Sequence, residues 1–443
     1  YGQFALLFSL SFLFSMLNDF GMTQVMSRYV PQLNLQGEIE NSKKLLNSFL
    51  ILRLVSGIFT AGLYLLVTYF WLKDIHFLSL LTMAIVVLIR SWTNPLFVFF
   101  LGLNQAARWG SREVLERLLS IPLLILFFYL GGLPGACLGL LLTEVFILIL
   151  GMWWGRPYLS RSHMHLDLHF LYPYLQFGLL FFISHVTSTA LQHSGGVLVR
   201  TFNPDYTQVS YFELAQKIFL TASFSYPQFS LSFTPLMTIL LKKGKTEILK
   251  EWVEQLLKWL TVAGVGIMFC FLLLGGDLVR LILGKAYQPV ATNLLPLSFV
   301  FFFLGLQSVS NLITLVYEKP KVALTASIFR LAIFWGSGFL LVIFWGSFGA
   351  CLAILIASMF YAGYLIWRTR IYLPYSLRRW MFAAGSGAFF LPLIGLRSSL
   401  SVNVVLFSFF FIGYMVILFL FRIITWSEVR TLGKSITSGI IRS

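Results

Sequence analysis

The sequence predicts an all-α, polytopic membrane protein with two six-helix lobes, related as parallel repeats, and two additional C-terminal helices. The first observation behind this prediction is composition. Of the 443 residues, 58% are hydrophobic and 11% are charged, and the mean hydropathy is +0.85, values that ordinary soluble domains do not reach. The second is that apolar runs of about 20 residues, long enough to cross a bilayer as helices, follow one another with short connections. The third is an internal sequence repeat.

The repeat is carried by a four-residue block. Residues 135–138, Gly-Ala-Cys-Leu, return 214 residues later as residues 349–352, and each block opens an apolar helix after a short Gly-containing turn. The same spacing places Arg28 on Lys242, but basic residues flank the helix ends of any membrane protein. The shared block is therefore the stronger indication of a duplication.

The apolar runs define the predicted spans in order. Five precede a polar linker, at residues 1–29, 45–71, 77–103, 114–130 and 133–154. Six follow it, at residues 170–202, 209–241, 252–274, 290–317, 322–344 and 347–367. Two more lie at residues 380–396 and 402–424. The sequence thus predicts about thirteen spans.

The spans and the linker predict four divisions of the chain. These are an N-terminal lobe (1–155), a cytoplasmic linker (156–169), a C-terminal lobe (170–367) and two extra helices with a cytoplasmic tail (368–443). Residues 1–4 align best with residues 209–212, which already follow a span. We therefore expect one further helix before residue 1 and about fourteen spans in the full protein. Because six spans per lobe is an even number, the repeats are expected to be parallel.

The net charge of +16 reflects topology. The basic residues lie at helix ends and not on one soluble face, so they do not indicate a nucleic-acid partner. Alternation of the spans assigns the richer set to the cytoplasmic side, namely Arg28, Lys44, Arg108, Arg112, Arg156, Arg161, Lys242, Lys243, Lys245, Lys319, Lys321, Arg368, Arg370, Arg378, Arg379, Arg430 and Lys434. The other side keeps Lys73, Arg200, Arg280, Lys285 and Arg397. This asymmetry supports the predicted topology.

Ionisable residues within the spans are the first functional candidates, because inserting each costs roughly 2.5 to 3.5 kcal/mol unless it meets a partner or a cavity. Arg90 lies at the centre of its span, so we expect it to line a transport path or to pair with Asp19 or Glu144. Glu213 and Lys217 are one helical turn apart. Either they neutralise each other, or Lys217 binds an anionic substrate group that Glu213 tunes.

The predicted span at residues 170–202 is the most polar. Polar and small residues recur on it at three- and four-residue steps, at His185, Thr189, Gln192, Gly196 and Arg200. Such a face lines a cavity or packs against another helix through small and polar residues. We take Gln192, His193 and Arg200 as transport-path candidates.

Motifs for cofactors or metals are not apparent. His163, His165 and His169 have a metal-like spacing, but no cysteine or matching carboxylate set accompanies them, so we expect no metal. There is no Walker sequence and hence no sign of ATP hydrolysis. We expect no cofactor.

Several segments resemble one family. Residues 1–5 (Tyr-Gly-Gln-Phe-Ala), 19–22 (Asp-Phe-Gly-Met) and 28–31 (Arg-Tyr-Val-Pro) resemble the opening region of bacterial polysaccharide flippases, after their first helix. Residues 211–217 (Tyr-Phe-Glu-Leu-Ala-Gln-Lys) resemble the helix after the midpoint, and residues 348–350 (Phe-Gly-Ala) the twelfth helix. The resemblance covers nearly the whole chain. It indicates the O-antigen and exopolysaccharide repeat-unit flippases of the multidrug/oligosaccharidyl-lipid/polysaccharide exporter superfamily.

The resemblance implies two lobes around a cavity that alternates between inward- and outward-facing states. It implies a polyprenyl-pyrophosphate-linked oligosaccharide as cargo, carried from the cytoplasmic to the periplasmic leaflet of the bacterial inner membrane. Arg90, Lys217 or Arg200 would hold the pyrophosphate. Transport would be driven by an H⁺ or Na⁺ gradient, with Asp19, Glu144 and Glu213 as candidate ion sites. Expected partners are the lipid bilayer and a polysaccharide polymerase or ligase.

Three alternatives stay open. A lipid II flippase and a drug/cation antiporter belong to the same superfamily. A polytopic glycosyltransferase or ligase would need acidic residues on a sizeable external loop, whereas Asp74, Asp205 and Asp277 lie on short loops. We therefore expect that the protein is not an enzyme, and the duplication also favours a transporter.

Overall fold

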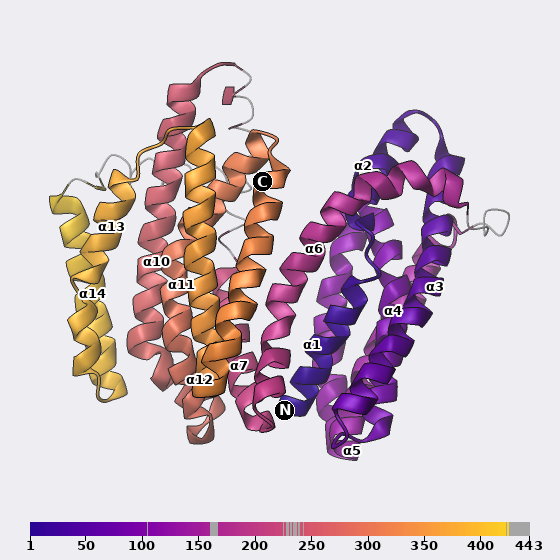
Figure 1. Ribbon diagram of the computed structural model, residues 1–443, viewed down its shortest axis with the longest axis horizontal. Helices are drawn as coiled ribbons and strands as arrows, with labels where there is room; N and C mark the ends of the chain where they lie inside the picture. Colours follow the sequence, from indigo (N-terminus) through magenta and orange to yellow (C-terminus); the bar gives the residue numbers. More distant parts are fainter. Residues whose placement is uncertain are drawn as a thin grey trace. The chain divides into compact units, whose positions relative to one another are not determined.

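The computed structural model describes residues 1–443 except 104, 160–166, 225, 227–229, 231–232, 234–236, 238–239, 242, 422 and 425–443. His163, His165 and the predicted cytoplasmic tail lie outside the described residues. The described chain is helical, contains no strand, and forms two compact units, Tyr1–Ser210 and Tyr211–Ser443 (Figure 1). The all-α prediction is confirmed, whereas the predicted lobe boundaries stay a prediction.

The first unit is a bundle of long helices. Its elements are α1 (Gly2–Met16), α2 (Met22–Leu35), α3 (Ile39–Trp71), α4 (Phe77–Gly102), α5 (Ala106–Gly155) and α6 (Leu168–Phe202). Asp167 caps α6 by accepting hydrogen bonds from Phe170 N at 2.9 Å and Lys44 Nζ at 2.7 Å. Both hydrogen bonds lower the pKa of Asp167, and the one from Lys44 has the larger effect. Helix α7 (Tyr206–Ser223) begins in this unit and continues into the second.

The prediction of one span over residues 1–29 is wrong, because the chain breaks between α1 and α2. Phe20 and Gly21 both have positive φ values, 49° and 68°, which no α-helix accommodates. A side chain at Gly21 would overlap the backbone of Gly178 on α6. The break thus depends on a close approach of two segments that are distant in sequence.

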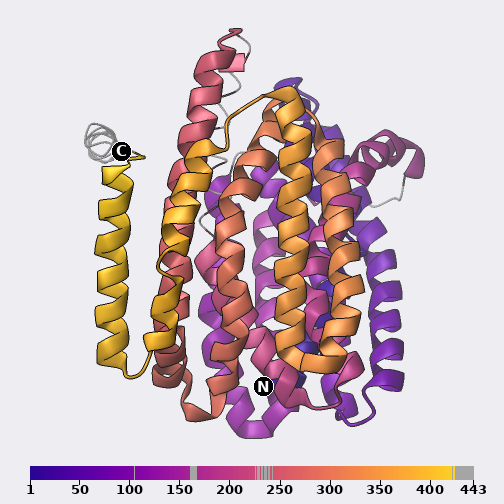
Figure 2. The ribbon, with the colours of Figure 1, turned by 60° about the vertical axis from the view of Figure 1, so that its left-hand side comes forward.

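The helices after residue 242 that the structure describes belong to the second unit. They are α10 (Thr246–Leu283), the 3-10 helix η2 (Lys285–Tyr287), α11 (Gln288–Val316), α12 (Pro320–Tyr372), α13 (Arg378–Ala388), the 3-10 helix η3 (Leu391–Leu396) and α14 (Leu400–Leu420) (Figure 2). The last helices are attached to α10. The rings of Phe269 and Phe410 stack with centroids 3.9 Å apart, and Arg397 Nη1 donates to Leu272 O at 2.7 Å.

The 214-residue repeat recurs in the secondary structure. Helices α4 and α11 end at Gly102 and Val316, and α5 and α12 begin at Ala106 and Pro320, so both boundaries keep the spacing seen in the sequence. Each of α5 and α12 is interrupted by a non-helical glycine, Gly132 (φ 57°, ψ −135°) or Gly346 (φ 52°, ψ −130°). The duplication is therefore confirmed at the level of local structure.

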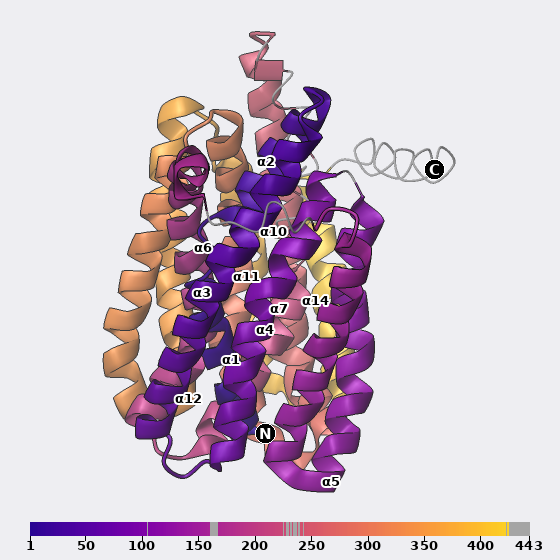
Figure 3. The same ribbon diagram turned by 90° about the vertical axis from the view of Figure 1, so that its right-hand side faces the viewer.

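Each interrupted helix is a hairpin of two arms (Figures 2 and 3). The glycine of the repeated block brings the arms together. A Cβ at Gly135 would overlap Phe127 O, and a Cβ at Gly349 would overlap Leu341 O. Only glycine permits this approach, which explains why the block occurs at equivalent positions in both halves.

The described helices suit a membrane protein. Eight of them are long and apolar enough to span a bilayer, and two of these eight are the hairpins α5 and α12, which supply two arms each. Bulky apolar side chains remain exposed on the outside, for example Phe59, Tyr129, Leu281 and Phe344. Such surfaces are stable in lipid, where apolar exposure carries no cost.

The hairpin geometry makes a testable prediction. We expect Gly349→Ala to destabilise the protein by about 1 to 3 kcal/mol, because the added methyl group forces the arms of α12 apart. Gly363→Ala on the same helix is the control, since nothing lies within 4 Å of its Cβ position. Thermal unfolding in detergent measures both. Equal melting temperatures for the two variants would refute the role of Gly349.

Candidate functional site

A buried ion pair lies in the middle of the first unit. Arg90 on α4 donates from Nε to Glu144 Oε1 on the second arm of α5 at 2.5 Å. The two side chains are 3% and 0% exposed. Glu116, on the first arm of α5, places Oε1 3.7 Å from Arg90 Nη2. One guanidinium therefore faces two carboxylates. Of the two partnerships considered for Arg90 from sequence, the one with Glu144 is present.

Aromatic rings also contact the guanidinium of Arg90. Its guanidinium lies 4.3 Å from the ring centroid of Phe12 and 5.4 Å from that of Phe8, both on α1, and Nη1 donates to Ser11 Oγ at 3.3 Å. Phe12 also contacts α6, because the imidazole of His193 stacks on its ring with centroids 4.6 Å apart and an interplanar angle of 3°. Four helices thus meet at this charged centre. Cation–π contacts in such desolvated surroundings are worth about 2 kcal/mol.

A second buried ion pair lies at the break between α1 and α2. Arg53 Nη2 donates to Asp19 Oδ1 at 2.8 Å and to Asp19 O at 3.2 Å, and Arg53 is 1% exposed. Arg53 is not among the ionisable residues that the sequence analysis places within the spans. Helix α3 begins at Ile39, so Arg53 lies about 21 Å along it, inside the apolar run. The apolar residues on both sides of Arg53, in Phe-Leu-Ile-Leu-Arg-Leu-Val at residues 49–55, indicate its position inside the span.

Arg112 and Glu116 are further charged residues that sequence reasoning missed. Arg112 Nη1 donates to Asn94 Oδ1 on α4, and Glu116 follows one turn later on α5. From sequence, Arg112 is predicted at a cytoplasmic helix end, and Glu116, inside the predicted span at residues 114–130, is not among the candidates. In the structure the chain is helical from Ala106, which carries these charges into the bundle.

Arg200 occupies the other end of α6. Its Nη2 lies 3.5 Å from Asp74 Oδ1, and its guanidinium lies 4.4 Å from the ring centroid of Tyr206. Tyr206 Oη donates to the same Asp74 oxygen at 3.0 Å. Partial burial raises the pKa of Tyr206 to about 12, so the hydroxyl keeps its proton. Gln192 is exposed on the same helix, away from this group.

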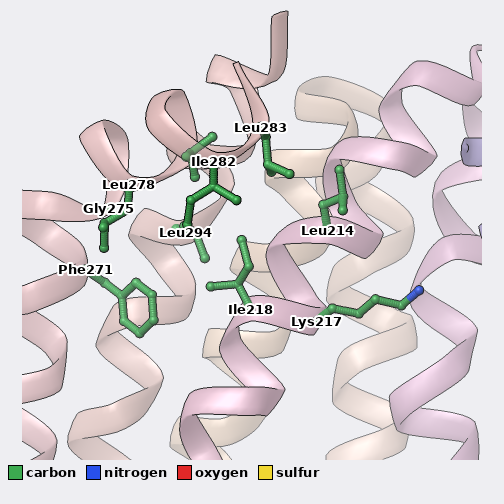
Figure 4. A pocket seen from close by; sticks show the side chains of 10 residues that line it. Leu214, Lys217, Ile218, Phe271, Gly275, Leu278, Ile282, Leu283 and Leu294 are labelled. Atoms are coloured by element: carbon green, nitrogen blue, oxygen red, sulfur yellow. The ribbon is translucent and has the colours of Figure 1, made fainter. Parts of the chain in front are cut away.

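The remaining candidates belong to the second unit. Glu213 on α7 is buried, whereas Lys217, one turn later, is exposed. Lys217 borders a cavity of about 220 Å³ between α7, α10 and α11. The cavity is lined by Leu214, Ile218, Phe271, Leu278, Ile282 and Leu294, among others. Figure 4 shows the amine of Lys217 directed away from these apolar side chains. An apolar space thus adjoins a cationic group.

The structure therefore separates the sequence candidates into groups. Arg90, Glu144 and His193 come together around Phe12. Asp19 pairs with Arg53, and Arg200 pairs with Asp74 near Tyr206. Glu213 and Lys217 lie on one helix of the second unit, and only Lys217 borders the apolar cavity.

The Arg90–Glu144 pair makes a second prediction. Arg90→Gln leaves Glu144 buried without its guanidinium, which costs about 3 to 5 kcal/mol of stability. The double variant Arg90→Met/Glu144→Leu is expected to recover most of this loss, because the fully buried carboxylate of Glu144 is removed with the guanidinium and the carboxylate that is left, Glu116, is partly exposed. Lys43→Gln is the control, since its pair with Glu40 is exposed and worth at most about 1 kcal/mol. A loss for Arg90→Gln no larger than that of the control would contradict the assignment.

Comparison with known proteins identifies the family. The family described as polysaccharide biosynthesis protein matches residues 1–241. No curated protein sequence matches the chain. Three solved structures are similar to the chain, and for each the first coverage is the share of this chain and the second is the share of the other protein. An inward-facing multidrug resistance MATE family transporter of the MOP superfamily is 16% identical, with coverage of 84% and 89% and a TM-score of 0.74.

The other two similar structures are a lipid II flippase and a transporter. The lipid II flippase MurJ in an inward closed conformation is 14% identical, with coverage of 95% and 97% and a TM-score of 0.63. A MOP superfamily transporter from Pyrococcus furiosus is 16% identical, with coverage of 84% and 86% and a TM-score of 0.58. At these identities the likeness concerns the fold. With a family match over more than half of its length, the chain belongs to the polysaccharide biosynthesis protein family, and its fold is similar to that of MATE transporters and MurJ.

Proposed function

We propose that this multi-pass membrane protein is a flippase for polyprenyl-pyrophosphate-linked oligosaccharide. It carries this cargo from the cytoplasmic to the periplasmic leaflet of the bacterial inner membrane by alternating access. Its family and fold are those of transporters and flippases, not of enzymes. The observation that carries the proposal is Lys217 beside an apolar cavity. The cargo combines an anionic head with an apolar chain, and this arrangement matches both parts.

The roles follow from the chemistry of the groups. Lys217 holds the pyrophosphate while the isoprenoid chain contacts the apolar surface of α7 and α10. Arg200 and its neighbour Tyr206 supply a further cation and hydroxyl along the path. Gln192 and His193 contact the sugars, for which polar and ring side chains are suited. Arg90 anchors α4 to α5 and contributes its field to the path.

Glu144 is the preferred coupling-ion site among the three candidates. Asp19 is matched one to one by Arg53. Glu144 instead shares Arg90 with Glu116, so this group of three carries one negative charge more than positive when all are ionised. A carboxylate that is fully buried and shares its guanidinium with a second carboxylate favours uptake of a proton or a small cation. Glu213, buried on α7, is the second candidate.

A lipid II flippase is the second candidate function. The fold likeness to MurJ extends over 95% of the chain, more than the 84% for the MATE structure quoted above. Both cargoes are lipid-linked glycans, so the arrangement around Lys217 suits either. For the polysaccharide cargo, a polymerase or ligase would consume the delivered product.

The deciding experiment follows lipid-linked oligosaccharide in a deletion strain. We expect finished oligosaccharide to accumulate in the cytoplasmic leaflet, and the full-length gene to relieve the accumulation. Lys217→Gln should restore less than about a tenth of export, because a charged hydrogen bond is worth about 1.5 to 3 kcal/mol. Lys243→Gln, in an exposed loop, should restore export fully.

The outcomes of this assay separate the alternatives. Normal flipping with a missing final sugar or failed ligation would make the protein an enzyme. Accumulation of lipid II in place of the oligosaccharide would make it a lipid II flippase. Full export by Lys217→Gln at normal protein levels would remove Lys217 from the path.

Coupling to an ion gradient is tested in proteoliposomes that contain a fluorescent lipid-linked oligosaccharide. We expect an imposed H⁺ or Na⁺ gradient to accelerate flipping by the native protein, and Glu144→Gln to lose this response because it cannot take up the ion. Glu40→Gln, an exposed carboxylate on α3, should respond like the native protein. An unchanged rate after collapse of both gradients would instead indicate downhill scrambling.

A further inference from the structure

The second unit contains a guanidinium inside an apolar hairpin. Arg330 lies on the first arm of α12, about 15 Å from its start at Pro320, within a helix apolar enough to span a bilayer. Among the described residues Arg330 makes no ion pair. Its Nη2 donates to Ser358 Oγ on the second arm at 2.9 Å. Its Nε is buried and has no hydrogen-bond partner among those residues.

The groups around Arg330 are polar but neutral. The ring of Tyr361 lies 4.9 Å from the guanidinium, and Tyr361 Oη donates to Asn311 Oδ1 at 3.1 Å. Gln307 Nε2 donates to Ser358 O at 3.0 Å. These contacts orient Ser358 and Tyr361 but supply no negative charge. An arginine cannot discharge itself by losing a proton, so the charge at this position calls for a counter-anion.

The repeat indicates what is different here. With the 214-residue spacing, Arg330 corresponds to Glu116 and Ser358 corresponds to Glu144. In the first unit these two carboxylates surround Arg90 and neutralise it. In the second unit one carboxylate has become a cation and the other a hydroxyl. The equivalent positions on the hairpin arms therefore carry two carboxylates in the first half and no carboxylate in the second half.

We propose that Arg330 and Ser358 form an anion-binding site in the second unit that takes a phosphate group. Guanidinium groups bind phosphate through paired, charge-assisted hydrogen bonds, and Nε with one Nη supplies such a pair. The Ser358 hydroxyl, which accepts from Arg330, donates its own proton to the anion.

The surroundings allow a ligand to arrive from the bilayer. Ile328 and Phe329, next to Arg330, are exposed on the apolar surface, and Arg330 itself is only partly buried. Lys319, Lys321 and Arg370 gather at the nearby end of α12 and raise the local concentration of anions. The phosphate belongs either to a lipid headgroup or to free phosphate. The site is distinct from the cargo path proposed around Lys217.

The experiment uses the purified full chain. Native mass spectrometry counts retained phosphatidylglycerol, with phosphatidylcholine as the neutral-headgroup comparison, and thermal unfolding records the effect of inorganic phosphate. We expect Arg330→Gln to lower phosphatidylglycerol retention or the phosphate-induced stabilisation about tenfold or more, as expected from losing a charged hydrogen bond. Retention of phosphatidylglycerol without a phosphate effect identifies a lipid headgroup as the source. A phosphate effect without lipid retention identifies free phosphate.

Two further variants keep the proposal testable if Arg330→Gln folds poorly. Ser358→Glu recreates the internal carboxylate of the first unit, so it should fold, pair with Arg330 and lose anion binding to the same extent. Lys243→Gln removes an exposed cation from a turn outside α12 and should retain binding. Native-like binding by Ser358→Glu, or the absence of any anion effect on the unaltered protein, would overturn the proposal.

Discussion

The absence of water from the hydrocarbon core is the constraint on which this structure depends. Every charge that enters the bundle must find its partner within the protein. The first unit meets this requirement with two ion pairs, Arg90 with Glu144 and Asp19 with Arg53, each joining segments far apart in sequence. Because the pairs fix which helices are neighbours, they act on specificity of packing as much as on stability. Apolar contact with lipid distinguishes helix faces far less, since lipid and apolar side chains are similar solvents.

The duplication supplies one scaffold with two different polar interiors. Gly132 and Gly346 turn the hairpins with similar backbone angles, and Gly135 and Gly349 both allow a close approach of the two arms. Backbone geometry of this kind tolerates few substitutions, because any Cβ would collide with a carbonyl oxygen. The polar positions between the arms have diverged: the carboxylates of Glu116 and Glu144 in the first half correspond to Arg330 and Ser358 in the second. Packing thus preserved the frame while the charge pattern changed.

The hairpin backbones and the polar side chains between them have different roles in the proposed transporter. The hairpins keep their arms in close contact, and the charged groups between the helices are those to which the proposed function assigns ions and cargo. In the second unit, the apolar cavity beside Lys217 offers both an apolar surface and a cation to an amphipathic ligand. In the first unit, the ring of Phe12 contacts the guanidinium of Arg90 and stacks on His193. These features accord with family membership and with a lipid-linked, anionic cargo.

The sequence by itself determined the fold class, the order of the apolar helices and the duplication, because hydropathy is a local property and the repeated Gly-Ala-Cys-Leu block reports a backbone requirement. It also marked Arg90 and Glu144 as costly residues that need partners. Only the tertiary structure decided that they pair with each other, that Arg53 is a buried partner of Asp19, and that the first apolar run breaks at Phe20 and Gly21. The reason is physical: the energy of a buried charge depends on which distant helix faces it, and that choice is made by packing, which no local pattern of residues records.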